Sequence, residues 1–243
     1  MTPYLLLVGS DDDDPAGPER DPGRAVLDDA VLFQRTLPAL LERHPGVARA
    51  TGYRLAVPDV RGDRGPSRLL VLEVADDGTL ETLLTSRAAP EPPAWAAAVA
   101  GPDPRWLVAW WRRPGWSGSA GDRAHPYLFL VGMDVPADAD PGQVAAFHRF
   151  YDAPHVPEVV DILGFDRGIR YERHRSVRHH PGPDAPAYLA AYDGAEDVVR
   201  AAEHPERAAG FTTAGPWAWE HRETRWRLLY RRTGGVLRLP RSS

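Results

Sequence analysis

The chain repeats part of itself, and this repeat constrains the possible fold more than any other feature of the sequence. PYLLLVGSD at positions 3–11 returns as PYLFLVGMD at positions 126–134, with seven of nine residues identical. Similarity continues in the same order and aligns four further pairs: Pro38 with Pro157, Gly46 with Gly164, Arg49 with Arg167 and Tyr53 with Tyr171. Self-similarity of this kind is typical of a structural unit that is present twice.

Within the first copy, short apolar runs of strand length alternate with stretches of helical spacing. The strand-like runs are Tyr4–Val8, Tyr53–Val57, Leu69–Val74 and Leu107–Trp111, and the helical stretches are Ala25–His44 and Gly78–Arg87. The order β-α-β-β-α-β gives a sheet whose helices cover one face only, so that the other apolar face needs a cover. We therefore predict an α+β fold in which two tandem ferredoxin-like βαββαβ repeats form one barrel within the chain.

The domain boundaries follow from the same pattern. We expect the first repeat over residues 1–113 and the second over residues 126–232. Residues 114–125 are rich in Gly, Ser and Pro, as a linker should be, and residues 233–243 are expected to form a flexible tail.

Composition excludes several kinds of chemistry. The chain has no Cys, which removes disulfides, thiolate nucleophiles, iron–sulfur clusters and cysteine zinc sites. All 29 basic residues are Arg, so that a Lys Schiff base is excluded as well. The net charge of −5 argues against nucleic acid as the main partner, and no apolar stretch is long enough for a membrane helix. We expect a cytoplasmic protein, with a homodimer as one possible assembly.

Polar residues that only one copy carries are not needed for the shared fold, and they are candidates for function. Four such residues follow one another in the second copy: Tyr151 opposite Leu32, Asp152 opposite Phe33, His155 opposite Thr36 and Glu158 opposite Ala39. An imidazole is the natural acid or base near neutral pH, and a carboxylate one turn away can fix its tautomer. The pattern predicts His155 as general base or acid, Glu158 or Asp152 as its orienting partner, and Tyr151 as an additional donor.

Helical spacing places these side chains on one stripe. Phe147, Tyr151, His155 and Glu158 fall within about 80° of arc at 100° per residue. Pro154 and Pro157 should kink the helix, which leaves the register across the kink open. The competing interpretation is that His155 and Tyr151 are ordinary core residues.

Further candidates for binding follow the helix. Arg167, Arg170 and Tyr171 lie on the next strand, where strand alternation sends Arg170 to the face opposite the other two. Trp217 could form the wall of an aromatic ligand site or complete the core. His174, His179 and His180 resemble a metal tract, although a solvated hairpin is the favoured interpretation, and no metal site is predicted. The Arg cluster between residues 222 and 232 is expected to be the solvated side of the last strand.

The string FHRFYDAPHVPEVVDILGFDRGIRYE resembles the dimeric α+β barrel superfamily, especially its EthD-like members. Members carry an aromatic-Tyr-Asp-x-x-His-x-Pro-Glu helix, a Gly-Phe-x-Arg strand and a later Pro-Trp segment. Matching positions here run from Phe150 to Glu158, from Gly164 to Arg167, and over Pro216 and Trp217. The resemblance covers residues 126–232 well and the first half only in outline, because the first half lacks the helix motif.

The resemblance implies a pocket for a hydrophobic small molecule between sheet and helices, with the helix His as acid or base. The leading hypothesis is a cofactor-independent cyclase, dehydratase or isomerase that acts on a polyketide-like intermediate of secondary metabolism. Two alternatives stay open: a haem-binding or cofactor-free oxygenase, with a His as axial ligand and Arg on the distal side, and a binding protein without catalysis.

Overall fold

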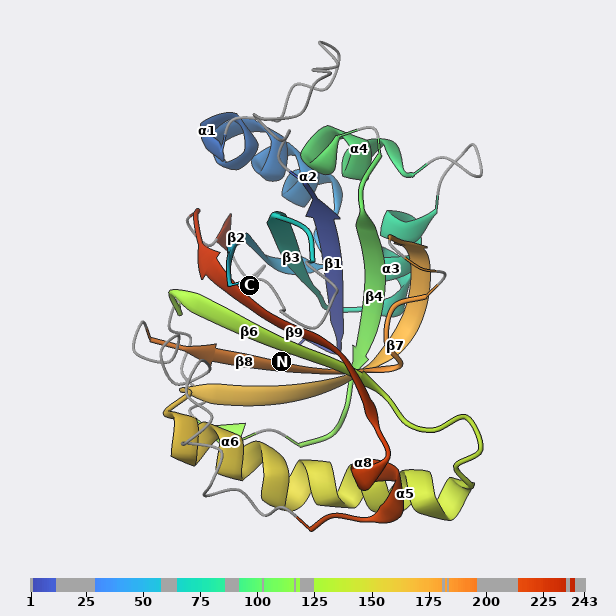
Figure 1. Cartoon of the computed structure of the whole chain (residues 1–243). Helices are drawn as coiled ribbons and strands as arrows, with labels where there is room; N and C mark the ends of the chain where they lie inside the picture. Colours follow the sequence, from blue (N-terminus) through green and yellow to red (C-terminus); the bar gives the residue numbers. More distant parts are fainter. Residues whose placement is uncertain are drawn as a thin grey trace, which may run out of the picture.

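The computed structural model describes most of the chain. The described residues are 2–11, 29–57, 65–85, 92–101, 103–115, 117–118, 125–180, 182, 184–195, 214–234 and 237–238. They form a mixed α+β fold with one antiparallel sheet (Figure 1).

The first half contributes four main strands. Its elements are β1 (Tyr4–Ser10), α1 (Asp29–Val31), the π-helix η1 (Leu32–Thr36), α2 (Leu37–Arg43), β2 (Val47–Val57), β3 (Arg68–Val74), α3 (Asp77–Leu84), α4 (Ala94–Ala100) and β4 (Trp106–Arg112). These strands lie in the order β2-β3-β1-β4, so that the strand with the repeated sequence, β1, is central.

The second half has the same strand order, β7-β8-β6-β9, with β6 in the central position. Its elements are β5 (Ser117–Gly118), β6 (Tyr127–Asp134), α5 (Pro141–Phe150), the π-helix η2 (Tyr151–His155), α6 (Val156–Leu163), β7 (Arg167–His179), β8 (Tyr188–Gly194), α8 (Trp217–Glu220), β9 (Glu223–Arg232) and β10 (Leu237–Arg238). The helix expected between β8 and β9 falls within residues 196–213, which lie outside the described residues.

Two contacts between the halves close the sheet into an eight-stranded barrel. β4 pairs with β7, and β2 pairs with β9, both antiparallel. The barrel interior is a continuous apolar core with large aromatic residues, among which Trp106 and Trp226 stack with ring centroids 4.3 Å apart. Because the outer strands of each half pair with those of the other, closure leaves few unpaired strand edges. It also lets the apolar inner face of each half cover that of the other.

Helices cover the outer faces of the two half-sheets from opposite sides, as Figure 1 shows with α2 and α4 at one end of the view and α5 and α6 at the other. The first layer packs around Leu37, Leu40 and Leu80 against β1 and β3. The second layer packs around Phe147, Val160 and the sheet residues of β6 and β8. The described residues therefore form three cores: the barrel interior and one layer outside each half-sheet.

A π-turn interrupts the long helix of each half at the aligned position. The Leu37 N–H donates to the Leu32 carbonyl, and the Val156 N–H donates to the Tyr151 carbonyl, each five residues back. Pro38 and Pro157 follow these turns, and a proline ring clashes with the carbonyl four residues earlier. The expected kink is thus a local widening of the helix into one π-turn, a feature that is frequent at functional sites.

Local signals fix the ends of the second long helix. Asp140 caps its start: its side chain accepts the Gln143 N–H, while the Gln143 side chain accepts the Asp140 N–H. Pro141 occupies the first turn, where its missing N–H has no cost. The helix ends at Gly164, whose φ of +78° is the left-handed conformation that favours glycine. These signals hold the stripe of candidate residues over the sheet.

Several elements differ from expectation. β2 begins at Val47 and β7 runs on to His179, so both strands are longer than their apolar runs suggested. Cross-strand pairing to the other half explains the extension of β7, because β4 pairs with it as far as His179. Leu237 and Arg238, placed in the expected tail, pair with β2. None of the helices in the described residues has the length and apolarity to cross a membrane.

Candidate active site

A cavity of about 360 Å³ lies on the outer face of the second half-sheet. Strands β6 and β9 form its floor, the η2–α6 helix forms one wall, and α8 forms another. The residues that line it are mostly apolar or aromatic: Phe129, Val131, Met133, Tyr151, His155, Val159, Leu163, Tyr192, Trp219, Glu220, Arg222, Thr224 and Arg227. An apolar pocket of this size with a few polar groups is typical of a small-molecule site.

His155 lies in an aromatic setting at the end of the π-turn. Its ring centroid is 4.3 Å from that of Trp219 and 5.0 Å from that of Tyr151. Burial, followed by the positive charge of Arg222, lowers the pKa of His155 to about 4, and the nearby Glu158 opposes this shift only in part. The imidazole is therefore uncharged at neutral pH, so that it can accept a proton or offer a lone pair to a metal.

Tyr151 is fully buried beneath the helix. The Arg170 guanidinium lies 4.1 Å from the centre of its ring, a cation–π contact. Burial raises the pKa of Tyr151, while Arg170 and the hydroxyl of Tyr192 act in the opposite direction. Its phenol is thus protonated at neutral pH and can serve the cavity as a hydrogen-bond donor.

Two arginines that were expected to be solvated line the cavity. Arg222 lies over the Trp219 ring at 3.4 Å from its centre, and Arg227 lies 5.7 Å from the centre of Phe129. The expectation of a solvated Arg cluster is wrong for Arg222, which is partly buried, whereas Arg227 is exposed as expected. Comparison of the two halves could have found Arg227. Arg227 pairs with Val131 between β9 and β6, and Leu107 pairs with Val8 at the equivalent place between β4 and β1. Trp219 carried no such signal.

The other predicted helix residues lie outside this cavity. Asp152 accepts a hydrogen bond from Arg170 at 2.8 Å, so that it positions Arg170 rather than His155. Glu158 influences the charge of His155 without lining the cavity. Phe147 is fully buried in the core beside Tyr151, and its ring lies 6.3 Å from that of Trp219.

The strand residues divide between two faces of the sheet, as alternation predicted. Arg170, 3% exposed, faces the helix layer, where it also contacts His148. Arg167 and Tyr171 face the barrel interior and line a separate cavity there. Arg167 and Tyr171 therefore line a different cavity from His155, and the substrate-binding role expected of the three residues stays a prediction. Trp217 is 39% exposed and stacks on His221, outside the cavity that Trp219 lines.

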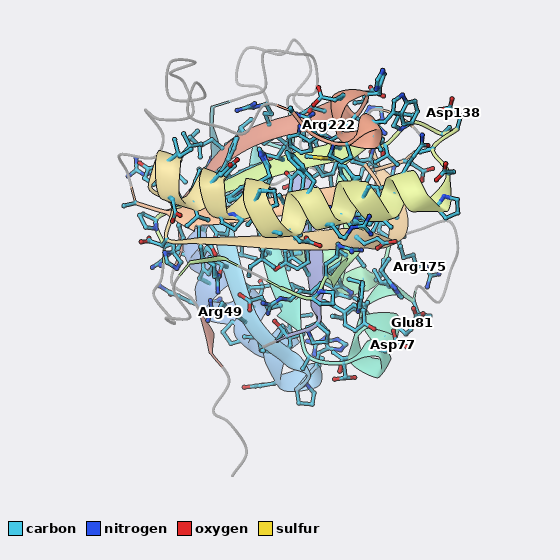
Figure 2. The ribbon with its side chains drawn as sticks, turned by 90° about the horizontal axis from the view of Figure 1, so that it is seen from below. Arg49, Asp77, Glu81, Asp138, Arg175 and Arg222 are labelled. Atoms are coloured by element: carbon cyan, nitrogen blue, oxygen red, sulfur yellow. The ribbon has the colours of Figure 1, made fainter. Side chains whose placement is uncertain are left out.

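The three histidines of the expected hairpin have different environments. His179 is buried and contacts both Trp106 and Trp226, so the solvated interpretation is wrong for it. His174 lies at the surface beside Asp77 and Glu81, with one ligand atom from each within 4.8 Å of the others. Glu81 also accepts a hydrogen bond from Arg175, so ordinary ion pairing accounts for this cluster. Figure 2 shows Asp77, Glu81 and Arg175 together and far from Arg222.

Comparisons with protein-family models and with curated proteins give no match. Solved structures do match along nearly the whole chain. A dye-decolorizing peroxidase from Bacteroides thetaiotaomicron VPI-5482 aligns over 96% of this chain and 93% of that protein, at 12% identity and a TM-score of 0.55. A protein provisionally named chlorite dismutase aligns over 96% of each chain, at 10% identity and a TM-score of 0.52.

The chain has the α+β barrel fold. A provisionally named monooxygenase from Lactobacillus acidophilus NCFM also aligns, over 99% of this chain and all of that one, at 9% identity and a TM-score of 0.45. The two alignments with TM-scores above 0.5 show the fold, and identities this low leave the activity to the site itself. In this α+β barrel the candidate site belongs to the second half and lies outside the barrel, beneath the helix with the π-turn.

Proposed function

We propose that the chain is an enzyme that deprotonates an apolar small molecule in the cavity of its second half, with His155 as the general base. The observation that carries this proposal is an uncharged imidazole in an apolar cavity that also contains two guanidinium groups. A proton can move to the imidazole, and the anion that remains can pair with Arg222 or Arg227. The low pKa of His155 favours the role of base over that of acid.

The same pKa limits the substrate class. A base whose conjugate acid has a pKa of about 4 removes only fairly acidic protons, such as those of phenols or of carbon between two carbonyl groups. An anionic or polarised substrate beside the ring would also raise the pKa of His155 and strengthen it as a base. Aromatic walls at Trp219 and Phe129 suit a flat or polycyclic body.

Deprotonation is the first step of two reaction classes, acid–base isomerisation or cyclisation and cofactor-free oxygenation. In the oxygenation, the substrate itself supplies four electrons to O₂. A methylene carbon becomes a carbonyl, one oxygen atom enters the product and the other leaves as water. Oxygen uptake during turnover of a polycyclic phenol that is stable in air separates these two classes.

A binding experiment tests the deprotonation directly. Para-nitrophenol absorbs visible light only as its anion, so the ionised fraction can be followed in a buffer below its own pKa. We expect the protein to increase this fraction, and we expect His155→Gln and Arg222→Gln to lose the increase. Arg225→Gln on the same strand is the matched control, since Arg225 pairs with Asp134 outside the cavity. An unchanged spectrum with the wild type would contradict the proposal.

Haem binding is the second candidate. The superfamily resemblance implied it, and a peroxidase and a protein named chlorite dismutase share the fold over 96% of the chain. The cavity residues fit the group in kind: His155 would ligate the iron through its uncharged ring, and Arg222 and Arg227 would pair with the carboxylates. The bound haem would supply redox chemistry with peroxide or O₂, and the aromatic walls would exclude water from it.

Addition of haem to the purified protein tests this candidate. A Soret band that forms in the wild type and shifts or disappears in His155→Ala would support it. A wild type that shows no band, while para-nitrophenol is still ionised, would leave only the deprotonation proposal. The two candidates therefore fail by different measurements.

We also infer that the chain arose as a tandem duplication of an EthD-like unit in which only the second copy retained the site. The aligned sequence segments, the equal strand order of the halves and the paired π-turns support this inference. The differences at positions 32, 36 and 107 of the first half support the loss of a first site.

A further inference from the structure

A second cavity, of about 40 Å³, lies at one end of the barrel interior, where the two halves meet. Unlike the rest of the barrel core, it is lined by charged and phenolic side chains as well as by apolar ones. Arg49 and Arg167, one from each half, are both among them. Figure 2 shows Arg49 well away from Arg222, so this cavity is distinct from the His155 cavity.

The lining is related by the internal repeat. Arg49 faces Glu73 across β2 and β3, and Arg167 faces Asp193 across β7 and β8. Both pairs form ion pairs, at 3.3 Å for the first and as a short contact for the second. The cavity is therefore built from matching groups on either side of an approximate two-fold axis.

Two tyrosines and one further arginine complete the polar lining. Tyr53 and Tyr171 occupy equivalent positions in the two halves, and each is less than a tenth exposed. Arg232 pairs with Tyr53 across β2 and β9. The Arg232 Nε donates to the carbonyl of Gly234 at 2.9 Å, and no carboxylate among the described residues forms an ion pair with it.

The charges of these lining residues do not cancel. Glu73 and Asp193 are each paired with one arginine, which leaves the charge of Arg232 without a carboxylate partner in the described lining. His125 adds an unmet polar atom: its Nδ1 lies 3.0 Å from Asp166, while its buried Nε2 has no hydrogen-bond partner among the described residues. The Arg232 side chain is partly buried and the His125 Nε2 atom is buried, and polar groups withdrawn from water are costly unless something pairs with them.

The geometry points to a binding site for one small monovalent anion, such as chloride or nitrate, between Arg232 and the hydroxyl groups of Tyr53 and Tyr171. The volume admits about three water molecules, which excludes an organic substrate. The single unmatched positive charge sets the valence of the ion. Both hydroxyls are donors, because burial raises the pKa of each phenol and keeps it protonated.

This site gives the anion a structural role. Its ligands come from β2, β7 and β9, so that the ion ties together strands of both halves at the point where the barrel closes. A ligand that binds only the folded state stabilises it in proportion to the logarithm of its concentration. The unfolding temperature should therefore depend on the kind of anion present, apart from any effect of ionic strength.

Thermal unfolding at constant ionic strength, with chloride or nitrate replacing the bulky gluconate ion, tests the site. We expect a saturable rise in the unfolding temperature, of about 3 to 6 °C at a tenfold excess over the Kd. Arg232→Gln should remove this rise. Arg231→Gln, on the exposed side of the same strand, is the matched control and should keep it. If Arg232→Gln does not fold, the Tyr53→Phe, Tyr171→Phe double variant takes its place and should weaken the response.

Crystals grown in bromide give the position of the ion. An anomalous peak among Arg232, Tyr53 and Tyr171, together with the temperature response, would establish the site. Water in the cavity without a bromide peak would overturn the inference. A peak without any anion-specific change in the unfolding temperature would mean an adventitious ion only and would overturn it too.

Discussion

The long helices of the two halves share their backbone arrangement and differ in their side chains. Residues 29–43 and 141–163 each follow a central strand and contain a π-turn at the aligned position before an aligned proline. The first helix seals an apolar core and borders a cavity of only about 20 Å³, whereas the second borders one of about 360 Å³. The π-turn is therefore part of the backbone arrangement that both halves share. The side chains on it determine whether the space beneath the helix is filled or open.

The side chains on and near the two π-turns explain the difference in cavity volume. Leu32 and Thr36 stand where the second half has Tyr151 and His155, and Leu107 stands where it has Arg227. Leu32 and Leu107 are buried in the first helix layer. In the second half, polar and aromatic groups replace these aliphatic ones around open volume. At these positions the two halves thus differ in their side chains and share the backbone arrangement.

The largest effect that would sharpen the comparison is on catalysis. His155→Ala should lower kcat/KM by about 100-fold or more on any substrate that the wild type turns over, because it removes the base. The aligned change in the first half, Thr36→Ala, should leave turnover as it is. Comparable losses in both variants, or none in His155→Ala, would break the assignment of the site to the second half.

Tyr151→Leu should lower the free energy of unfolding by about 2 to 3 kcal/mol, measured in urea. The change installs the residue type of position 32, but it removes the ring over which the buried Arg170 guanidinium lies. Tyr151→Phe keeps that ring and should cost less than half as much. If Tyr151→Leu cost no more than Tyr151→Phe, the cation–π contact would not matter for stability.

The second layer should also be less stable in acid. The pKa of His155 is lowered to about 4 and that of His148 to about 3, in both cases chiefly by burial. An unfolded chain takes up these protons near pH 6.5, so the stability that the uncharged rings contribute is present above that pH. It should be lost progressively as pH falls from about 6.5 towards 4. Unfolding temperatures of the wild type and His155→Gln across this range should converge at low pH.

Replacement of either aligned glycine, Gly46 or Gly164, by Ala should lower the stability of the protein, for a different reason at each position. At Gly46 a Cβ would meet the Thr79 Oγ1 and Asp76 Oδ2 atoms, so Gly46→Ala should disturb the cap of α3 and cost about 1 to 2 kcal/mol. At Gly164 there is open space, but φ is +78°, so Gly164→Ala should cost about 1 kcal/mol through backbone strain. Urea unfolding measures both, and a Gly46→Ala variant as stable as the wild type would contradict the crowding at α3.

Much of this fold could be predicted from the sequence, because the signals were local. The repeated PYLLLVGSD and PYLFLVGMD segments became the two central strands, and the barrel fold that the repeat indicated is the fold observed. The ends of β2 and β7 could not be predicted, since their outer parts are stabilised by strands of the other half. α4 was missed because its run of alanines has no amphipathic period.

The site could be predicted only in part. Tyr151 and His155 differ in kind between the copies, so the comparison found them. Asp152 differs as well, yet its carboxylate turns to Arg170, a contact that helical spacing cannot reveal. Arg222 and Trp219 come from the segment between the strands and reach the cavity only through the tertiary fold. The barrel-end cavity was missed because the comparison singled out only residues that differ between the halves, whereas Arg49 and Arg167, like Tyr53 and Tyr171, are identical.

One matched pair of variants tests the central claim most directly. Val8 and Val131 occupy the same place in the two central strands, but Val8 is buried in a filled layer while Val131 lines the large cavity. Urea unfolding of Val8→Phe and Val131→Phe compares the two places. Val8→Phe should cost about 1 to 3 kcal/mol through overpacking, and Val131→Phe should cost less than about 0.5 kcal/mol because its ring enters open volume. Equal losses in the two variants would contradict a filled first half and a hollow second one.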